Sequence, residues 1–339
     1  MSYRIRLEPS GHEFTALPQE SLLEAALRSG INPRYSCSNG SCGDCRVRVR
    51  EGKVGQHMHS DFHFSAQEQA RGYVMLCTTH AESDLVIEAD ESNSPSDIPE
   101  QQLTVKVAKV ERRNDQVAVL HLRTSRSNTL RFLAGQHVEL ELDGLPPFAA
   151  TIASCPCNGM HLYFHIHRAT DHPFAAQVFE GLRIGTVLRL RGPYGVLTLD
   201  DDSPRPLLMV ALGTDFAAIK SLIEHALNLE MAQPLRLYWL ADAATGHYMD
   251  NYCRAWNDVL DDFAFKEITL AHPLPNGEEM AALMDQLAQT LQTLGEADIY
   301  LAGPEAFTAS CASGLLQRGA TPDRLFTFHR QLAIRNEGA

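Results

Sequence analysis

The sequence has no excess of positive charge. Its 339 residues include 29 Lys and Arg against 42 Asp and Glu, which gives a formal net charge of -13. A protein that binds DNA or RNA must neutralise phosphates with cationic side chains, so we expect no nucleic-acid partner. The sequence also lacks a run of about 18 apolar residues, and its opening MSYRIRLEPS lacks the apolar stretch of a signal peptide. We therefore expect a cytoplasmic protein without a membrane span.

The eight cysteines are unevenly distributed, and four of them lie in the first quarter of the chain: Cys37, Cys42, Cys45 and Cys77. Disulfides are uncommon in a reducing compartment, so such a cluster favours metal ligation. The spacing C-x4-C-x2-C, with a fourth cysteine far downstream, is the plant-type [2Fe-2S] arrangement. Structural zinc usually takes two C-x2-C pairs, and the second pair is absent here. The sequence predicts a [2Fe-2S] cluster, with zinc or a metal-free turn as the alternatives.

The residues around these cysteines predict a small domain of strands and helices. Gly40 and Gly43 lie inside the cysteine loop and permit the chain to fold tightly around a cluster. Alternating side chains at 3–7, 46–50 and 84–88 predict strands, and Ser21-Leu-Leu-Glu24 is a capping box that predicts a helix start. The polar, proline-containing stretch that follows predicts an interdomain linker.

Two further units are expected after the linker. Short alternating segments predict an antiparallel barrel, with strands at 103–110, 117–122, 137–142, 162–167 and 187–191. The pattern then changes to strands that alternate with helices. The expected strands are LLMVA, LRLYWL and DIYLA, and the expected helices cover 216–229, 278–293 and 304–317. This alternation predicts a parallel sheet covered on both faces.

Over nearly its whole length the chain resembles the ferredoxin-NADP reductase-like electron-transfer proteins that reduce bacterial oxygenases and the deoxysugar-forming dehydratase system. The matching segments include Phe132-Leu-Ala-Gly135-Gln136, Phe164-His-Ile-His167 and Gly192-Pro-Tyr-Gly195. The resemblance implies a multidomain α+β and α/β fold. Its parts are a β-grasp ferredoxin at 1–90, a linker at 91–102, a flavin-domain-like antiparallel β-barrel at 103–203 and a nicotinamide-domain-like doubly wound parallel α/β sheet at 204–339.

The resemblance also implies chemistry and a partner. Members of the family take a hydride from NADH or NADPH onto FAD or FMN, and single electrons then leave through the iron-sulfur cluster. The expected partner is therefore a redox protein, such as an oxygenase or another electron donor or acceptor.

The flavin motifs of the family are altered in this chain. Where the family has R-x-Y-[ST], with Arg on the flavin phosphate and Tyr on the ring, this sequence has Phe148-Ala-Ala150-Thr151. Where it has G-x-x-[ST], this sequence has His172-Pro-Phe-Ala175. The guanidinium, the stacking aromatic and the phosphate-binding hydroxyl are therefore missing. Proline suits a first helical turn, so we expect the helix to remain while FAD or FMN binding is doubtful.

The nicotinamide motifs are altered as well. The family's G-G-T-G corresponds to Leu212-Gly213-Thr214-Asp215, which adds bulk and places a carboxylate where a pyrophosphate would bind. We expect Asp215 to cap the following helix with its own side chain. Ala302 replaces the family's cysteine beside the nicotinamide, and the ending Phe326-Thr-Phe-His-Arg330 is atypical. NAD(P)H binding is therefore doubtful, and no catalytic residue is assigned.

Other histidines and cysteines permit weaker hypotheses. Three histidines alternate along one expected strand and a fourth follows it, so their imidazoles could converge on a second metal or a haem, or only line a polar cleft: His161, His165, His167 and His172. Cys155 and Cys157 flank a proline, which predicts an extended segment that holds the two thiols apart. Cys253 and Cys311 are expected to pack inside helices.

Three functions fit these observations. The first is a [2Fe-2S] electron carrier whose reductase-like body has lost flavin and NAD(P)H binding and serves as a docking surface. The second is an active NAD(P)H-dependent flavin and iron-sulfur reductase that supplies an oxygenase or a deoxysugar dehydratase. The third is an iron-sulfur sensor or accessory protein without turnover.

Overall fold

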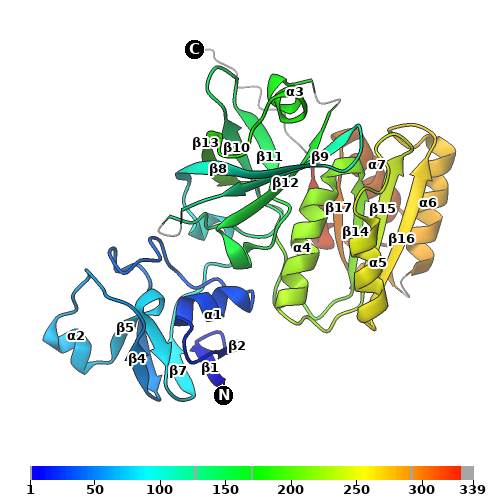
Figure 1. The fold of residues 1–339 in the computed structure, drawn as a ribbon. Coiled ribbons are helices and arrows are strands. Elements are labelled where there is room, and N and C mark those ends of the chain that lie inside the picture. The colour runs from blue at the N-terminus through cyan, green and yellow to red at the C-terminus, as the bar shows by residue number, and fades with distance from the viewer. Residues whose placement is uncertain (1, 126–127, 169–170, 291–292, 330–339) are drawn as a thin grey trace, which may run out of the picture.

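The computed structural model describes residues 2–125, 128–168, 171–290 and 293–329 (Figure 1). Three sheets of the expected kinds follow one another along the chain. In the part of the chain that the structure describes, no helix is long and apolar enough to cross a membrane. Two of the sequence expectations fall partly outside the described residues. These are Arg330 of the segment 326–330, and residues 291 and 292 of the helix expected at 278–293.

The first sheet has the strand order β2-β1-β7-β3-β5. Its strands are β1 (Tyr3–Glu8), β2 (Glu13–Ala16), β3 (Arg46–Glu51), β5 (Tyr73–Met75) and β7 (Leu85–Glu88). β1 and β7 are parallel neighbours, whereas the other pairs are antiparallel. The smaller elements are α1 (Leu22–Arg28), α2 (Ala66–Ala70), the β4–β6 pair (Val54–Gln56 and Thr79–Ala81) and a 3-10 turn at Leu76–Thr78.

Helix α1 begins as the sequence predicts. The Ser21 side chain accepts a hydrogen bond from the Glu24 backbone N–H, and the Glu24 carboxylate accepts one from the Ser21 backbone N–H. The apolar face of α1 packs into the core of this sheet through Leu22, Leu23 and Ala26. A capping box satisfies two backbone donors that a helix would otherwise leave unpaired, which fixes where α1 starts.

The second sheet is a nearly closed antiparallel barrel in the order β11-β10-β13-β8-β9-β12. Its strands are β8 (Gln101–Arg112), β9 (Val117–Arg123), β10 (His137–Glu141), β11 (Phe148–Thr151), β12 (His161–His167) and β13 (Val187–Tyr194). The two edge strands meet through a bridge between Ile152 and Phe164. The stretch expected as a linker contains a 3-10 turn, Pro95–Asp97, and its last two residues already belong to β8.

The third sheet is parallel, in the order β16-β15-β14-β17-β18. Its strands are β14 (Leu207–Leu212), β15 (Leu235–Asp242), β16 (Phe263–Leu270), β17 (Asp298–Ala302) and β18 (Leu325–Phe328). Two helices cover each face: α4 (Phe216–Asn228) and α5 (Asp250–Val259) on one, α6 (Gly277–Thr290) and α7 (Glu305–Leu316) on the other (Figure 1). This is the doubly wound arrangement that alternating strands and helices predict.

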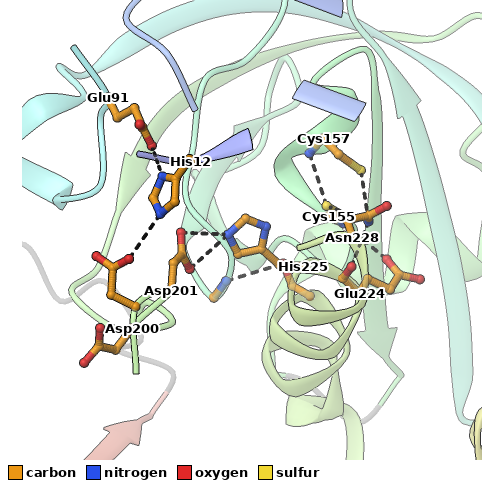
Figure 2. A network of polar contacts seen from close by, with 12 residues as sticks. His12, Glu91, Cys155, Cys157, Asp200, Asp201, Glu224, His225 and Asn228 are labelled. Atoms are coloured by element: carbon orange, nitrogen blue, oxygen red, sulfur yellow. Dashed lines mark hydrogen bonds and ion pairs between the residues drawn. The ribbon is translucent and has the colours of Figure 1, made fainter. Parts of the chain in front are cut away.

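The first sheet and its helices, which we call the ferredoxin part, contact the rest of the chain partly through a small polar network. His12, in the turn between β1 and β2, lies 2.8 Å from Glu91 of the linker and 3.1 Å from Asp202, which precedes β14. The neighbouring Asp201 pairs with His225 of α4 at 3.2 Å (Figure 2). The adjacent Asp201 and Asp202 thus contact histidines from two different parts of the fold.

Candidate functional site

The four amino-terminal cysteines are delivered by one loop and one short turn. Cys37 and Cys42 lie in the loop before β3, Cys45 directly precedes that strand, and Cys77 lies in the 3-10 turn Leu76–Thr78. Gly40, with φ +83°, has no room for a side chain, because an added Cβ would lie 2.7 Å from Thr78 Cγ2. A glycine here therefore lets the loop close onto the turn that carries Cys77.

The cysteines form two pairs. Cys45 Sγ lies 3.2 Å from Cys77 Sγ in a buried position, and the Cys37 thiol hydrogen-bonds with that of the exposed Cys42. Burial raises the pKa of Cys37, but the Asn39 backbone N–H and the Ser41 and Cys42 side chains outweigh it and lower the pKa to about 6. Hydrogen bonds that favour the thiolate prepare this sulfur to bind a metal.

The paired arrangement fits a two-iron cluster better than a single metal ion. Within the described ranges, no three His, Cys, Asp or Glu side chains meet where they could hold one ion. A structural zinc needs four ligands around a single ion, whereas each iron of a [2Fe-2S] cluster takes two protein ligands. The two cysteine pairs therefore fit a [2Fe-2S] cluster, which would supply one-electron chemistry at this edge of the ferredoxin part.

A cluster held by four thiolates should have a low reduction potential. We expect a value on the order of −400 mV, because replacement of thiolates by histidines is what raises the potential of such clusters. A redox titration followed by electron paramagnetic resonance measures it. A potential near zero would contradict the all-cysteine ligand set.

The positions that correspond to the flavin motifs are filled by packed side chains. Phe148, at the start of β11, is buried, and its ring lies 5.0 Å from that of Phe174 and 5.1 Å from that of His172. Ala150, Thr151 and Ala175 are buried as well. An apolar stack therefore occupies the place where the family pattern calls for a guanidinium.

The expected helix at this site is α3 (Pro173–Glu180), which begins at the proline as the sequence predicts. His172 Nδ1 accepts a hydrogen bond from the Phe174 backbone N–H at 3.2 Å. The free N–H groups of a helix start are its anion-binding groups. The His172 imidazole therefore accepts from one of the N–H groups that a flavin phosphate would need.

The turn after β14 does not behave as the sequence analysis expects. Gly213–Asp215 form a 3-10 turn that runs directly into α4, and Asp215 makes no side-chain capping hydrogen bond. The expectation that its carboxylate caps α4 is wrong, because Asp215 already has helical backbone angles (φ −69°, ψ −5°), whereas a capping residue is extended. The Asp215 side chain remains buried beside Thr214 at the carboxyl end of β14.

Aromatic packing further closes this turn. Trp239 of β15 donates its indole N–H to the Gly213 carbonyl at 3.0 Å, and its ring stacks 4.0 Å from that of Phe216. Ala302, at the end of β17, is fully buried, and an added Cβ on Gly303 would lie 3.3 Å from Leu212 Cβ. The residues that replace the nicotinamide motifs are thus part of a packed core.

The four histidines of the barrel do not converge. His161 bonds to His121 at 2.9 Å, His165 to the Tyr248 hydroxyl at 2.9 Å, and His167 to the Thr245 hydroxyl at 3.1 Å. His172 caps α3 instead. The hypothesis of a shared metal or haem is wrong, since alternation along β12 gives a common face but each imidazole reaches a different neighbour.

Sequence reasoning did not single out Lys220, which joins the barrel to α4. Its ammonium is buried, donates to the Ala153 carbonyl at 3.0 Å and pairs with Glu224 one helical turn away. A lysine within the otherwise apolar segment FAAIKSLI is the signal that could have revealed it. Burial of a charge is tolerated only with such partners.

Comparisons with known proteins agree with this architecture. Residues 5–82 match the model of the 2Fe-2S iron-sulfur cluster binding domain family. The chain is 24% identical to the CDP-6-deoxy-L-threo-D-glycero-4-hexulose-3-dehydrase reductase of Yersinia pestis, over 96% of this chain and 98% of that protein. It is 28% identical to the propane 2-monooxygenase reductase component of Gordonia sp. strain TY-5, over 96% of each chain.

A solved structure shows the same fold. The Amycolatopsis cytochrome P450 reductase GcoB matches with a TM-score of 0.59 at 22% identity, over 96% of this chain and 98% of that one. The 2Fe-2S domain, the barrel and parallel sheet that follow it, and relatives that align from end to end show that the chain is similar over nearly its whole length to ferredoxin reductase-like electron-transfer proteins with an N-terminal ferredoxin domain.

Proposed function

We propose that the chain is a one-electron carrier that uses a [2Fe-2S] cluster bound by Cys37, Cys42, Cys45 and Cys77. Its reductase-like body binds neither flavin nor NAD(P)H tightly, and a redox protein such as an oxygenase exchanges electrons with the cluster. The observation that carries this proposal is the contrast between two sites. The cysteine pairs are complete, whereas the flavin-phosphate position holds the buried, stacked rings of Phe148 and Phe174, with the His172 ring tilted against Phe148.

The relatives support the choice of partner. Two of them are reductase components that serve a dehydrase and a monooxygenase. A partner of this kind needs an accessible cluster, and the exposed Cys42 leaves one side of the cysteine loop open to an approaching protein. We therefore place the electron-exchange face at the Cys37–Cys42 pair.

The end-to-end similarity to named reductases favours a second candidate, an active NAD(P)H-dependent reductase with displaced flavin contacts. Flavin content separates the two functions. A reductase must hold its flavin through many turnovers, whereas the carrier needs only the iron-sulfur cluster.

We expect the protein, purified without air, to show an iron-sulfur spectrum and to release little FAD or FMN on extraction. Flavin uptake should increase several-fold in the triple variant Phe148→Arg, Ala150→Tyr and Ala175→Ser. The variant restores a guanidinium that can bind the flavin phosphate, an aromatic ring that can stack on the flavin, and a hydroxyl. Flavin fluorescence after extraction, together with titration by added FAD and FMN, measures both effects.

The change Ala149→Tyr is the matched control. Ala149 lies between the substituted positions on β11, and its side chain points to the other face of the strand. This variant should leave flavin uptake unchanged. One flavin per chain in the unmodified protein would contradict the carrier proposal and establish the reductase.

A further inference from the structure

The segment that joins β11 to β12 carries a second pair of cysteines. Pro156–Asn158 form a 3-10 turn with Cys155 at its N-cap, and Cys155 Sγ accepts the Cys157 backbone N–H at 3.2 Å. The expectation of an extended segment with separated thiols is therefore wrong. Proline is favoured in the first turn of a helix, so Pro156 is compatible with this turn. The turn brings the two side chains together, and their thiols interact.

Helix α4 holds this pair from the other side. The Asn228 side-chain amide donates to Cys155 Sγ at 3.2 Å and to Cys157 Sγ at 3.5 Å (Figure 2). The Glu224 carboxylate accepts the Cys155 backbone N–H at 3.2 Å, and Lys220 pairs with the same carboxylate. One amide thus contacts both sulfurs, so they lie on the same side of the turn.

The two thiols differ in access. Cys155 is only 5% exposed, whereas Cys157 is half-buried and lines two cavities. One cavity, of about 620 Å³, is also lined by His161 and Tyr163 and touches the little-exposed Cys155. The other, of about 890 Å³, extends to Cys77 of the ferredoxin part. A small molecule can therefore reach Cys157 first, with Cys155 directly behind it.

We propose that Cys155 and Cys157 form a reversible intramolecular disulfide by exchange with a low-molecular-weight disulfide. Cys157 attacks the small disulfide, forms a mixed disulfide and releases one small thiol. Cys155 then attacks Cys157 Sγ and releases the second small thiol. The two protein thiols lose two electrons and two protons, and the small disulfide is reduced to two thiols. This modification goes beyond the proposed electron-carrier function and does not depend on it.

The electrostatic surroundings assign the two roles in the same order. Burial raises the pKa of Cys155, so it loses its proton less readily than Cys157 and reacts second. The hydrogen bond from Cys155 and the charge of Lys220 lower the pKa of Cys157, against burial and the Glu224 carboxylate. The thiolate is the nucleophile in exchange, so the accessible and more acidic cysteine makes the first attack.

The test treats the full-length, cluster-loaded protein with oxidised glutathione and then alkylates the remaining thiols. Peptide mass analysis should find the segment with Cys155 and Cys157 unalkylated and lighter by two hydrogen atoms, and dithiothreitol should restore both thiols. The iron-sulfur absorbance should not change, which separates this reaction from damage to the cluster.

Two substitutions distinguish the attacking from the resolving thiol. Cys155→Ser should accumulate glutathione on Cys157, because no second thiol displaces it, and Cys157→Ser should show neither adduct nor disulfide. Cys311→Ser, a buried cysteine in α7, is the control and should react like the unmodified protein. Full alkylation of both cysteines after oxidation, or an adduct on Cys155 in the Cys157→Ser variant, would overturn the proposal.

Discussion

Replacing Cys77 with serine is expected to remove most of the iron and of the visible absorbance of the purified protein. Cys77 lies 3.2 Å from Cys45, and the two sulfurs form the buried half of the ligand set. A hydroxyl is a poorer ligand than a thiolate for iron-sulfur clusters, so one iron would lose half of its protein ligands. Iron content per chain and the absorbance spectrum measure the loss.

Cys311→Ser provides the comparison for this change as well. It makes the same substitution at a buried cysteine that packs between α7 and α6, far from the ferredoxin part. Iron content in this variant should match that of the unmodified protein. If Cys77→Ser retains full iron and an unchanged spectrum, the ligand assignment is wrong.

The unmodified protein should not measurably oxidise NADH or NADPH with ferricyanide as the acceptor. A pyrophosphate at the turn after β14 would approach the Asp215 carboxylate, and like charges a few ångströms apart near a protein surface repel by roughly 4 kcal/mol. The dipole of α4 offsets at most about 2 kcal/mol of this repulsion. Calorimetry should correspondingly show weak or absent nucleotide binding.

The double change Leu212→Gly and Asp215→Gly should restore nucleotide binding before it restores turnover. It removes the bulk and the charge at the turn, but Ala302 and the flavin positions remain altered. Asp261→Gly, which removes an equal charge from an exposed loop, is the control and should bind no better than the unmodified protein. Oxidation of NADH by the unmodified protein at ordinary enzymatic rates, on the order of 10 per second, would contradict the carrier proposal.

Patterns that are local in sequence predicted the fold well. The Ser21–Glu24 capping box gives the start of α1, and alternation of strands and helices gives the doubly wound sheet. Among the elements that were missed, α5 and β16 carry many polar residues because α5 exposes most of one face and β16 is an edge strand. An element that packs against the core on one side only has few apolar residues, so its sequence pattern is too weak to predict it.

Side-chain partners were harder to predict than elements. Cysteine spacing indicates a cluster, but only the folded loop shows that Cys45 pairs with Cys77. The Asp215 and Cys155–Cys157 expectations were wrong for one reason. Each depended on an extended backbone, and the chain forms a 3-10 turn at both places. Such turns are set by packing against distant strands and helices, which a sequence window does not contain.

The position of His12 between Glu91 and Asp202 makes one contact of the ferredoxin part with the rest of the chain depend on a proton. Burial lowers the pKa of His12, but the hydrogen bonds and charges of Glu91 and then Asp202 outweigh it and raise the pKa above its ordinary value of 6.5. The contact is therefore fully present below pH 6.5 and is lost as the pH rises through the raised value. The ion pairs of His12 are therefore expected to hold the cluster-bearing part against the body more strongly at acid pH, whereas the contact of the Arg131 guanidinium with the Tyr35 ring joins the same two parts without this proton.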